Sequence, residues 1–175
     1  MALPKIKTVT YELELPSTSE KIKYRPFLVK EQKILMQAQE SGNDNEINDS
    51  LANIISECTF NEIDPWKLPS FDAEYLFLKI RGKSVGDKVT LNVLCPDDNK
   101  TRVDVDVNLE EVNVTMQVGH TNEIGLVDDI KIIMTYPTLK DIGAVGKLEG
   151  DTEQVFSMLK RCIYQIHEGD TIHRL

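Results

Sequence analysis

The sequence predicts an α+β fold with an N-terminal β-hairpin, a helical middle, a small antiparallel β-unit and a closing helix. Apolar and polar residues alternate with the two-residue period of a strand in the first thirty residues and again over residues 86–136. The 3.6-residue period of a helix governs residues 29–82 and 151–167. The change of pattern divides the 175 residues into two predicted subdomains, 1–84 and 85–175, although one compact domain also suits this length.

Two strands near the N-terminus predict the hairpin. The first strand alternates apolar residues with glutamates, and the second alternates them with lysines, around the turn segment PSTSE. The apolar positions are Tyr11, Leu13, Leu15, Ile22 and Tyr24. The acidic polar face of one strand then lies opposite the basic polar face of the other, and such pairs contribute a few tenths of a kcal/mol, up to about 1, toward the register.

The pair Arg25-Pro26 marks the change from strand to helix. Pro26 cannot donate a hydrogen bond to a strand ladder, so strand pairing is expected to stop there. The residue before a proline is held extended, which fixes Arg25. A helix is predicted from Val29, and the Ser41-Gly42 pair ends it with a left-handed cap residue.

Two more helices complete the helical middle. The second has apolar residues at i, i+4, i+7, i+8 and i+11, namely Ile47, Leu51, Ile54, Ile55 and Cys58. A loop with two prolines follows over residues 59–70. Ser70 is the predicted N-cap of the third helix, with acidic residues in its first turn, and Gly82 is its predicted end.

The second half of the chain predicts strands and then a helix. Four alternating runs, at residues 89–93, 103–107, 112–118 and 130–136, indicate one antiparallel unit with a single polar face. The closing helix is expected from Asp151, which is spaced from Gln154 as in a capping box. The last eight residues, EGDTIHRL, are read as a polar tail.

The charge balance favours a protein partner over nucleic acid. The chain has 20 Lys and Arg against 29 Asp and Glu, a net charge of −9. Nucleic-acid binding requires clustered positive charge, and here even the most basic segments are diluted by carboxylates. No nucleic-acid partner is therefore predicted.

Neither secretion nor membrane insertion is predicted. The N-terminus lacks the apolar segment of a signal peptide, and no window approaches the ~18 consecutive apolar residues of a membrane span. The three cysteines, Cys58, Cys95 and Cys162, are far apart and odd in number, so they do not indicate a disulfide framework. These features are typical of a protein in a reducing cytoplasm.

No catalytic, cofactor or metal site is predicted. The chain has no phosphate-binding loop, nucleophile elbow or metalloprotease motif, and its three histidines are interpreted as surface residues. Cys95 and its turn resemble half of a zinc ribbon, but Asp98 occupies the place of the second thiolate. A hydrolase that uses Asp97, Asp98 and a histidine is the alternative class, and no grouping of residues favours it.

Trp66 and Phe71 flank a proline-containing loop, WKLPSF. Aromatic residues are enriched at binding hot spots, so this loop is a candidate docking surface. The alternative interpretation is that both rings close the core between the second and third helices.

Several unusual strings occur in a characteristic order: MALPKIKTVTYELELPST, KIKYRPFLVKEQKILMQAQESG, IISECTF and DPWKLPSFDAEYLFLKIRGKSVGD. Together they resemble the baseplate hub assembly proteins of T-even-type contractile-tailed bacteriophages. The resemblance covers about residues 1–110, and extends more loosely to the YPTL element and the last helix.

The resemblance implies a late protein of tail morphogenesis, a non-enzymatic factor that binds other baseplate hub proteins. It would act in the host cytoplasm during assembly, as a chaperone or as a permanent structural subunit of the virion baseplate. A generic cellular adaptor domain remains the alternative. Some members carry paired cysteines near the position of Cys95, of which this chain keeps one. Arg25, Lys30 and Lys33, expected to be exposed, are the candidate partner contacts.

Overall fold

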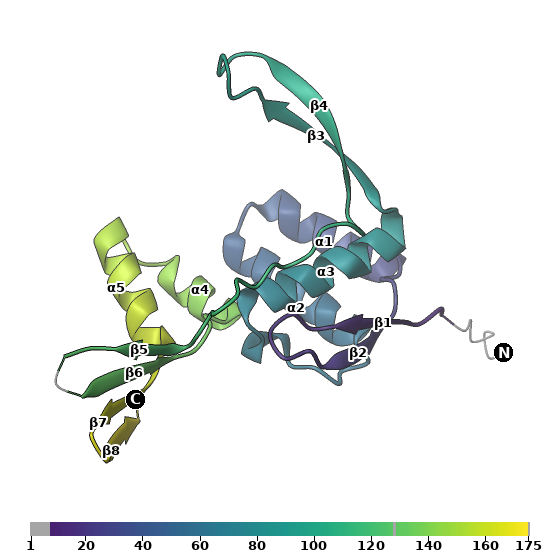
Figure 1. Cartoon of the computed structure of the whole chain (residues 1–175). Helices are drawn as coiled ribbons and strands as arrows, with labels where there is room; N and C mark the ends of the chain where they lie inside the picture. Colours follow the sequence, from purple (N-terminus) through teal and green to yellow (C-terminus); the bar gives the residue numbers. More distant parts are fainter. Residues whose placement is uncertain (1–7, 128, 175) are drawn as a thin grey trace.

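The computed structural model describes residues 8–127 and 129–174 and confirms the α+β class. This part of the chain holds five α-helices, a short 3-10 helix and eight strands, which form three separate antiparallel sheets. Three helices lie at the centre, one β-hairpin projects from them, and a four-stranded sheet with two further helices lies at the other end (Figure 1).

The N-terminal hairpin forms in the predicted register. Strand β1 (Tyr11–Glu14) pairs with β2 (Lys21–Tyr24), so that Glu12 faces Lys23 and Glu14 faces Lys21. Residue Asp72 holds the turn, because its carboxylate accepts hydrogen bonds from the backbone and the hydroxyl of Ser17. The hairpin is thereby fixed to the start of the third helix.

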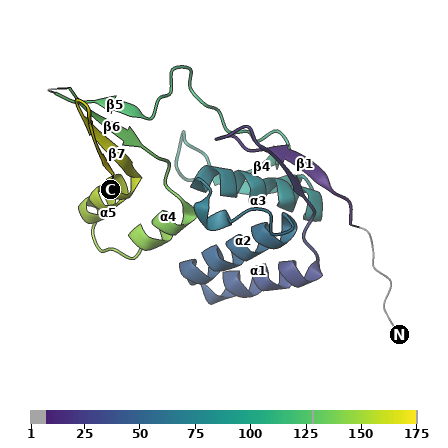
Figure 2. The same cartoon turned by 90° about the horizontal axis from the view of Figure 1, so that it is seen from below.

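The helical middle contains α1 (Val29–Ser41), α2 (Asp44–Cys58), the 3-10 helix η1 (Pro65–Lys67) and α3 (Ser70–Val85). Figure 2 shows α1, α2 and α3 side by side. Gly42 ends α1 in the left-handed conformation, with φ of 63°, as predicted. Residues of α2, α3 and the N-terminal hairpin form one buried core, including Leu15, Ile22, Ile54, Ile55, Leu76 and Ile80.

Helix α3 differs from the prediction at both ends. Ser70 is its first residue and Pro69 precedes it as the cap, so Ser70 is not the N-cap. Gly82 does not end the helix, which continues to Val85. The extension is stabilised from outside, since the Ser84 hydroxyl accepts a hydrogen bond from the Phe27 backbone at 2.9 Å.

The predicted β-unit is two separate sheets. Strands β3 (Lys88–Leu94) and β4 (Arg102–Asn108) pair only with each other and form a hairpin that stands away from the helices (Figure 1). The predicted strand at residues 112–118 is wrong. The start of this segment lies along α3, where the Lys79 ammonium donates to the Val112 carbonyl and the Tyr75 hydroxyl donates to the Asn113 side chain. Residues 112–118 form no strand.

The second sheet has the order β5-β6-β7-β8 and lies at the C-terminal end of the chain. Its strands are β5 (Glu123–Gly125), β6 (Ile130–Met134), β7 (Ile163–Glu168) and β8 (Thr171–Arg174). The predicted closing helix is therefore too long. Helix α5 (Asp151–Cys162) ends where β7 begins, because Ile163 and Ile166 pair with β6. The tail read as polar forms β8 instead.

Both helices of this region begin differently from the prediction. Asp151 is not a cap, since α5 begins after Gly150, whose φ is 90°, and no side chain caps it. Helix α4 (Leu139–Val145) was not predicted. Thr138 and Asp141 form its reciprocal capping box.

Helix α4 connects the two halves of the chain. Its first residue, Leu139, is 6% exposed and belongs to the core of the helical middle. The Ser70 backbone donates to the Pro137 carbonyl at 2.9 Å, beside a bridge between Pro69 and Thr138. Among the described residues, no helix is both long enough and apolar enough to cross a bilayer.

Candidate protein-binding surfaces

One face of the β3–β4 hairpin is entirely apolar. Successive side chains of a strand point to opposite faces, so the register places three apolar cross-strand pairs on the same face. These pairs are Val89–Val107, Leu91–Val105 and Val93–Val103, and we call them the hydrophobic ladder. The residues of the two pairs nearer the hairpin tip, Leu91–Val105 and Val93–Val103, are 38–46% exposed. A large part of the ladder therefore faces solvent, where the sequence predicted a strand face buried in a core.

The opposite face of the hairpin satisfies its own polar groups. The Thr90 hydroxyl donates to Asp106 at 2.7 Å, and the Asn92 amide donates to Asp104 at 2.6 Å. Arg102 donates to the Asn92 carbonyl at 3.1 Å. This face is complete as a solvated surface, which leaves the ladder as the face open to a partner.

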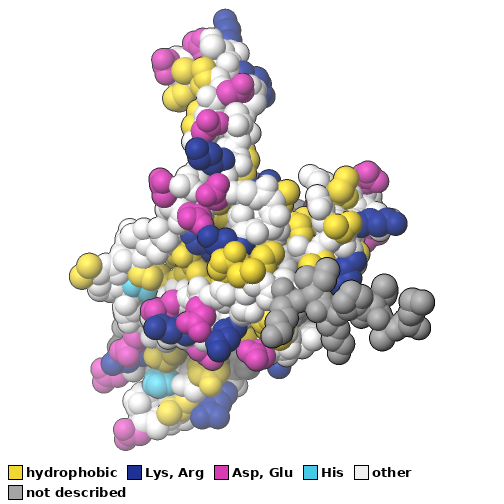
Figure 3. Space-filling view, turned by 90° about the vertical axis from the view of Figure 1, so that its right-hand side faces the viewer, with side chains coloured by type: hydrophobic (Ala, Val, Ile, Leu, Met, Phe, Trp, Pro, Cys, Tyr) yellow, Lys and Arg dark blue, Asp and Glu magenta, His cyan; other side chains and the backbone are white. Residues whose placement is uncertain are grey.

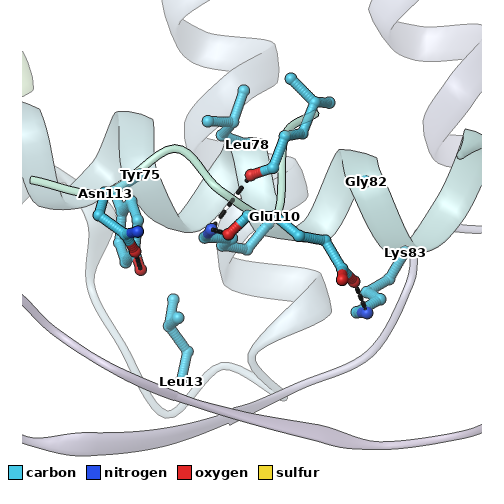
Figure 4. Close-up of a pocket in the computed structure, with 9 residues that line it drawn as sticks. Leu13, Tyr75, Leu78, Gly82, Lys83, Glu110 and Asn113 are labelled. Atoms are coloured by element: carbon cyan, nitrogen blue, oxygen red, sulfur yellow. Dashed lines mark hydrogen bonds and ion pairs between the residues drawn. The ribbon is translucent and has the colours of Figure 1, made fainter. Parts of the chain in front are cut away.

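A pocket lies at the base of the hairpin. It has a volume of about 290 Å³ and an apolar lining from Leu13, Leu78 and Leu109. Figure 4 shows it between α3 and the segment that follows β4, and we call it the root pocket. Leu109 lies just past β4, and its backbone N–H donates to the Asp87 carbonyl at 2.6 Å, so the pairing of the hairpin extends to it. At 6% exposure it is the buried end of the apolar row.

Two lysines of α3 fix the chain that borders the root pocket. The Lys79 ammonium donates to the carbonyls of Leu109, Glu110 and Val112 at 3.1, 2.8 and 2.8 Å. Burial lowers the pKa of Lys79, and Glu110 opposes this effect. The Lys83 ammonium pairs with the Glu110 carboxylate, which raises the pKa of Lys83. Both cations are thus engaged by protein groups.

Other apolar side chains are exposed on two helices. On α5, Val155, Phe156 and Leu159 are 56%, 66% and 49% exposed. On α1, Val29 and Met36 line a shallow groove. Figure 3 shows hydrophobic side chains on the projecting hairpin and a cluster of them below it, next to Lys and Arg side chains. The hairpin differs from the helical patches because its apolar row leads into a pocket.

The expectation that Arg25 is exposed is wrong, because Arg25 is only 9% exposed. Its guanidinium donates to the Glu31 carboxylate at 2.9 Å and to the Pro26 carbonyl at 3.0 Å. The other Glu31 oxygen accepts the Leu28 backbone N–H at 2.7 Å, at the start of α1. The structure therefore gives Arg25 a role inside the protein.

Lys30 and Lys33 are exposed on α1, as expected. The Lys30 ammonium lies 3.3 Å from both Glu31 and Glu57, and these carboxylates raise its pKa. Lys33 lines the shallow groove along α1. Lys30 and the buried Arg25 share the carboxylates of Glu31 and Glu57 at the junction of β2, α1 and α2, whereas Lys33 lies on the groove of α1.

Trp66 and Phe71, the two aromatic residues of the candidate docking loop, lie apart from this junction. Trp66 is half-buried in η1 and packs against the core, which agrees with the alternative interpretation for this residue. Phe71 is half-buried as well, and its ring meets that of Tyr136 edge-on, with centroids 4.9 Å apart. Both rings are used in internal packing, and neither contributes to the ladder.

The groups considered for catalysis or metal binding make ordinary local contacts. The Cys95 thiol donates to Asp97 at 3.3 Å. The Thr101 hydroxyl and two backbone N–H groups hold the pKa of Asp98 at about 2. Burial raises the pKa of Cys58 to about 11. Within residues 8–127 and 129–174, no three His, Cys, Asp or Glu side chains are grouped as metal ligands.

The ladder and the root pocket were absent from the predicted site. The alternation that builds the ladder was visible, but the sequence does not show whether a strand face is covered. One signal was available in the sequence: the runs 89–93 and 103–107 are of equal length and flank the polar turn PDDNK, so they can pair fully with each other without a third strand. In the structure both strands extend to seven residues and do so. A hairpin of this kind can stand alone and leave both faces open.

Comparison with known proteins identifies the family. The family model described as T4 bacteriophage base plate protein matches residues 8–175. No curated protein and no solved structure matches the chain significantly. The matched range includes the helical middle, the projecting hairpin and the C-terminal sheet, and it favours a phage protein over a cellular adaptor. The chain therefore belongs to the T4 bacteriophage base plate protein family.

Proposed function

We propose that the chain is a non-enzymatic protein-binding factor that acts in the assembly of the baseplate hub. Family membership supports a role with other baseplate proteins. The observation that carries the proposal is the projecting hairpin, whose hydrophobic ladder is 38–46% exposed over the two pairs nearer its tip. An exposed apolar row on a projecting element is the type of surface that marks a protein–protein contact.

Physical arguments support a partner for this hairpin. A two-stranded hairpin is marginally stable in water by itself, and burial of its apolar face provides the missing free energy. Each methylene group removed from water contributes about 0.8 kcal/mol. A second protein that covers the ladder would therefore gain affinity and would also fix the hairpin.

The proposal favours a chaperone over a permanent subunit of the virion. An acidic protein, with a net charge of −9, suits the task of covering a basic or apolar face of a hub subunit until its final neighbour arrives. The factor would act in the host cytoplasm while the tail is built. Retention in the virion tail baseplate is the second possibility, and family membership supports both roles equally.

The non-enzymatic part of the proposal is supported by how the polar groups are used. Lys79 and Lys83 are occupied by carbonyls and by Glu110, and Asp104 and Asp106 are occupied by neighbouring amide and hydroxyl groups. Catalysis requires polar groups that converge on a substrate instead.

The test is co-expression with each baseplate protein of the same phage, followed by affinity purification and mass spectrometry of purified virions. The chaperone role predicts a stable complex with at least one hub protein and absence from the virion. Presence in virions at a fixed copy number would show a permanent subunit. Failure to bind any baseplate protein would contradict the proposed function.

A further inference from the structure

We propose that the hydrophobic ladder and the root pocket form one docking strip for a different baseplate protein. The complementary surface of that protein is an apolar strip with Lys or Arg side chains along its rim. This inference rests on the proposed function and adds to it the binding surface and the chemistry of the partner.

The strip follows β4 and extends one residue beyond it. Val103, Val105 and Val107 share a face of β4. Leu109 lies just past the end of the strand, where its backbone N–H donates to the Asp87 carbonyl at 2.6 Å and continues the pairing by one step. Leu109 also lines the root pocket. The apolar row thus starts near the tip of the hairpin, where it is open, and ends in a pocket at the root.

The root pocket suits an apolar side chain. Leu13, Leu78 and Leu109 contribute its apolar lining, and its volume of about 290 Å³ accommodates a large side chain. All three N–H donors of Lys79 are used on backbone carbonyls, so this cation is not free for an anionic ligand. An anchor side chain that fills a well-packed pocket is a common form of a binding hot spot.

A second copy of the chain is a poor occupant. Seven residues per strand at ~3.3 Å each and two strands give the ladder an area on the order of 200–250 Å². A contact confined to the ladder would then bury about 500 Å² in total with any partner, below the ~1,200 Å² of a stable interface, so the partner must also cover the root and its acidic surroundings, where a second copy would meet like charge. Each copy also carries a net charge of −9, so two copies repel each other.

Charge complementarity points to a basic rim on the partner. Residues 87–111, which form the hairpin and its root, contain seven acidic and three basic residues, a net charge of −4. The ladder itself has no charged residue, and Asp104 and Asp106 lie on the opposite face. The other acidic residues stand at the two ends of the ladder, Asp97 and Asp98 at the tip and Asp87, Glu110 and Glu111 at the root. A partner with an apolar centre would match the uncharged ladder, and basic residues at its rim would match the acidic residues around it.

The first experiment uses the double variant V103T/V105T in the full chain. Threonine keeps the shape and strand propensity of valine and adds a hydroxyl that disfavours burial. The matched control is V118T/V127T, the same chemical change at two loop valines that are 106% and 76% exposed. Thermal unfolding of both variants checks that the fold is retained.

Binding is measured against the baseplate protein that co-purifies with the unmodified chain. We expect V103T/V105T to raise Kd about tenfold and the control to leave Kd unchanged. Equal binding by V103T/V105T and the unmodified chain would overturn the docking strip and leave the proposed function intact. Equal losses in both double variants would also overturn it. If no baseplate protein binds the unmodified chain, the proposed function itself fails.

Two further measurements test the occupant. Higher salt is expected to weaken the complex by slowing association, because a charged rim is screened. A Kd that stays constant between low and high salt would overturn the basic rim. Sedimentation of the unmodified chain alone is expected to show a monomer. A dimer that forms with the unmodified chain and is lost in V103T/V105T would overturn the choice of partner.

Discussion

Arg25 shows how much of a single residue the sequence can predict. The backbone effect was predictable, because Pro26 follows it directly and ends the strand. The burial was not, because it depends on Glu31 and on the Cys58 carbonyl, which accepts the Arg25 backbone N–H at 2.9 Å. Arg25 and Glu31 have side chains 10% and 2% exposed, and this ion pair joins β2 to the first turn of α1.

The variant R25M is expected to destabilise the fold by about 3–5 kcal/mol, because the buried Glu31 carboxylate loses its buried cation and keeps only the exposed Lys30 ammonium beside it. The measurement is chemical denaturation. K33M, the same change of a long cation to methionine on the exposed surface of α1, is the control and should stay within about 0.5 kcal/mol of the unmodified chain. A loss below about 1 kcal/mol in R25M would contradict the assigned role.

The same carboxylate predicts a pH dependence. Burial raises the pKa of Glu31, but hydrogen bonds from Arg25 and the Leu28 N–H outweigh it and leave the pKa below its ordinary value. The folded pKa is thus lower than the unfolded one. The stabilisation is fully present above the unfolded pKa, about 4.3, and is lost as the pH falls through the folded pKa.

Denaturation of the unmodified chain and of E31Q at several pH values tests this prediction. The stability difference between the two chains should be constant from pH 7 to about pH 5 and should shrink below about pH 4. A difference that is independent of pH down to pH 2.5 would show that the Glu31 pKa is not lowered by folding.

At the scale of elements, local patterns predicted the structures that depend on nearby residues. The first hairpin, α1 and α2 form where their periodicity and caps indicated. Strand β7 was missed because Ile163 and Ile166 continue the helical stripe of α5, whereas β6, their partner, lies about thirty residues away in the chain. The Gly169-Asp170 turn, with Gly169 at φ of 54°, was the available signal for β8.

Helix α3 provides a prediction about the glycine inside it, Gly82, and the glycine that follows it, Gly86. Gly82 lies inside the helix, and a Cβ there would meet the Leu109 Cβ at 3.8 Å, an ordinary contact. G82A is therefore expected to stabilise the fold by about 0.4–1 kcal/mol, because alanine costs less entropy in a helix.

Gly86 is the matched control on the same segment. Its φ of 119° and ψ of 152° belong to a region that is almost exclusive to glycine, so G86A is expected to cost about 1–3 kcal/mol. Thermal unfolding compares the two variants. A lower melting temperature for G82A than for the unmodified chain would show that Leu109 packs more tightly over α3 than the structure indicates.

At the scale of the whole molecule, the two predicted subdomains are connected through α4. Leu139 lies after the predicted boundary at residue 84, yet it is part of the core formed by α2, α3 and the first hairpin. Sequence periodicity could not show this contact, since one apolar residue at the start of a seven-residue helix makes no pattern. The projecting hairpin, by contrast, contributes only Leu109 at its root to the buried residues.

The variant L139A tests whether the two halves unfold as one unit. Removal of a buried leucine side chain is expected to lower the free energy of unfolding by about 2–5 kcal/mol. I142A is the control on the same helix, and its loss should be smaller because Ile142 is 36% exposed.

Trp66 is the single tryptophan and packs against the same core, so its fluorescence reports unfolding of the helical middle. If L139A shifts the urea midpoint seen by Trp66, α4 stabilises the helical middle and the chain unfolds cooperatively. An unchanged midpoint would mean that residues 1–84 unfold independently, as a separate subdomain.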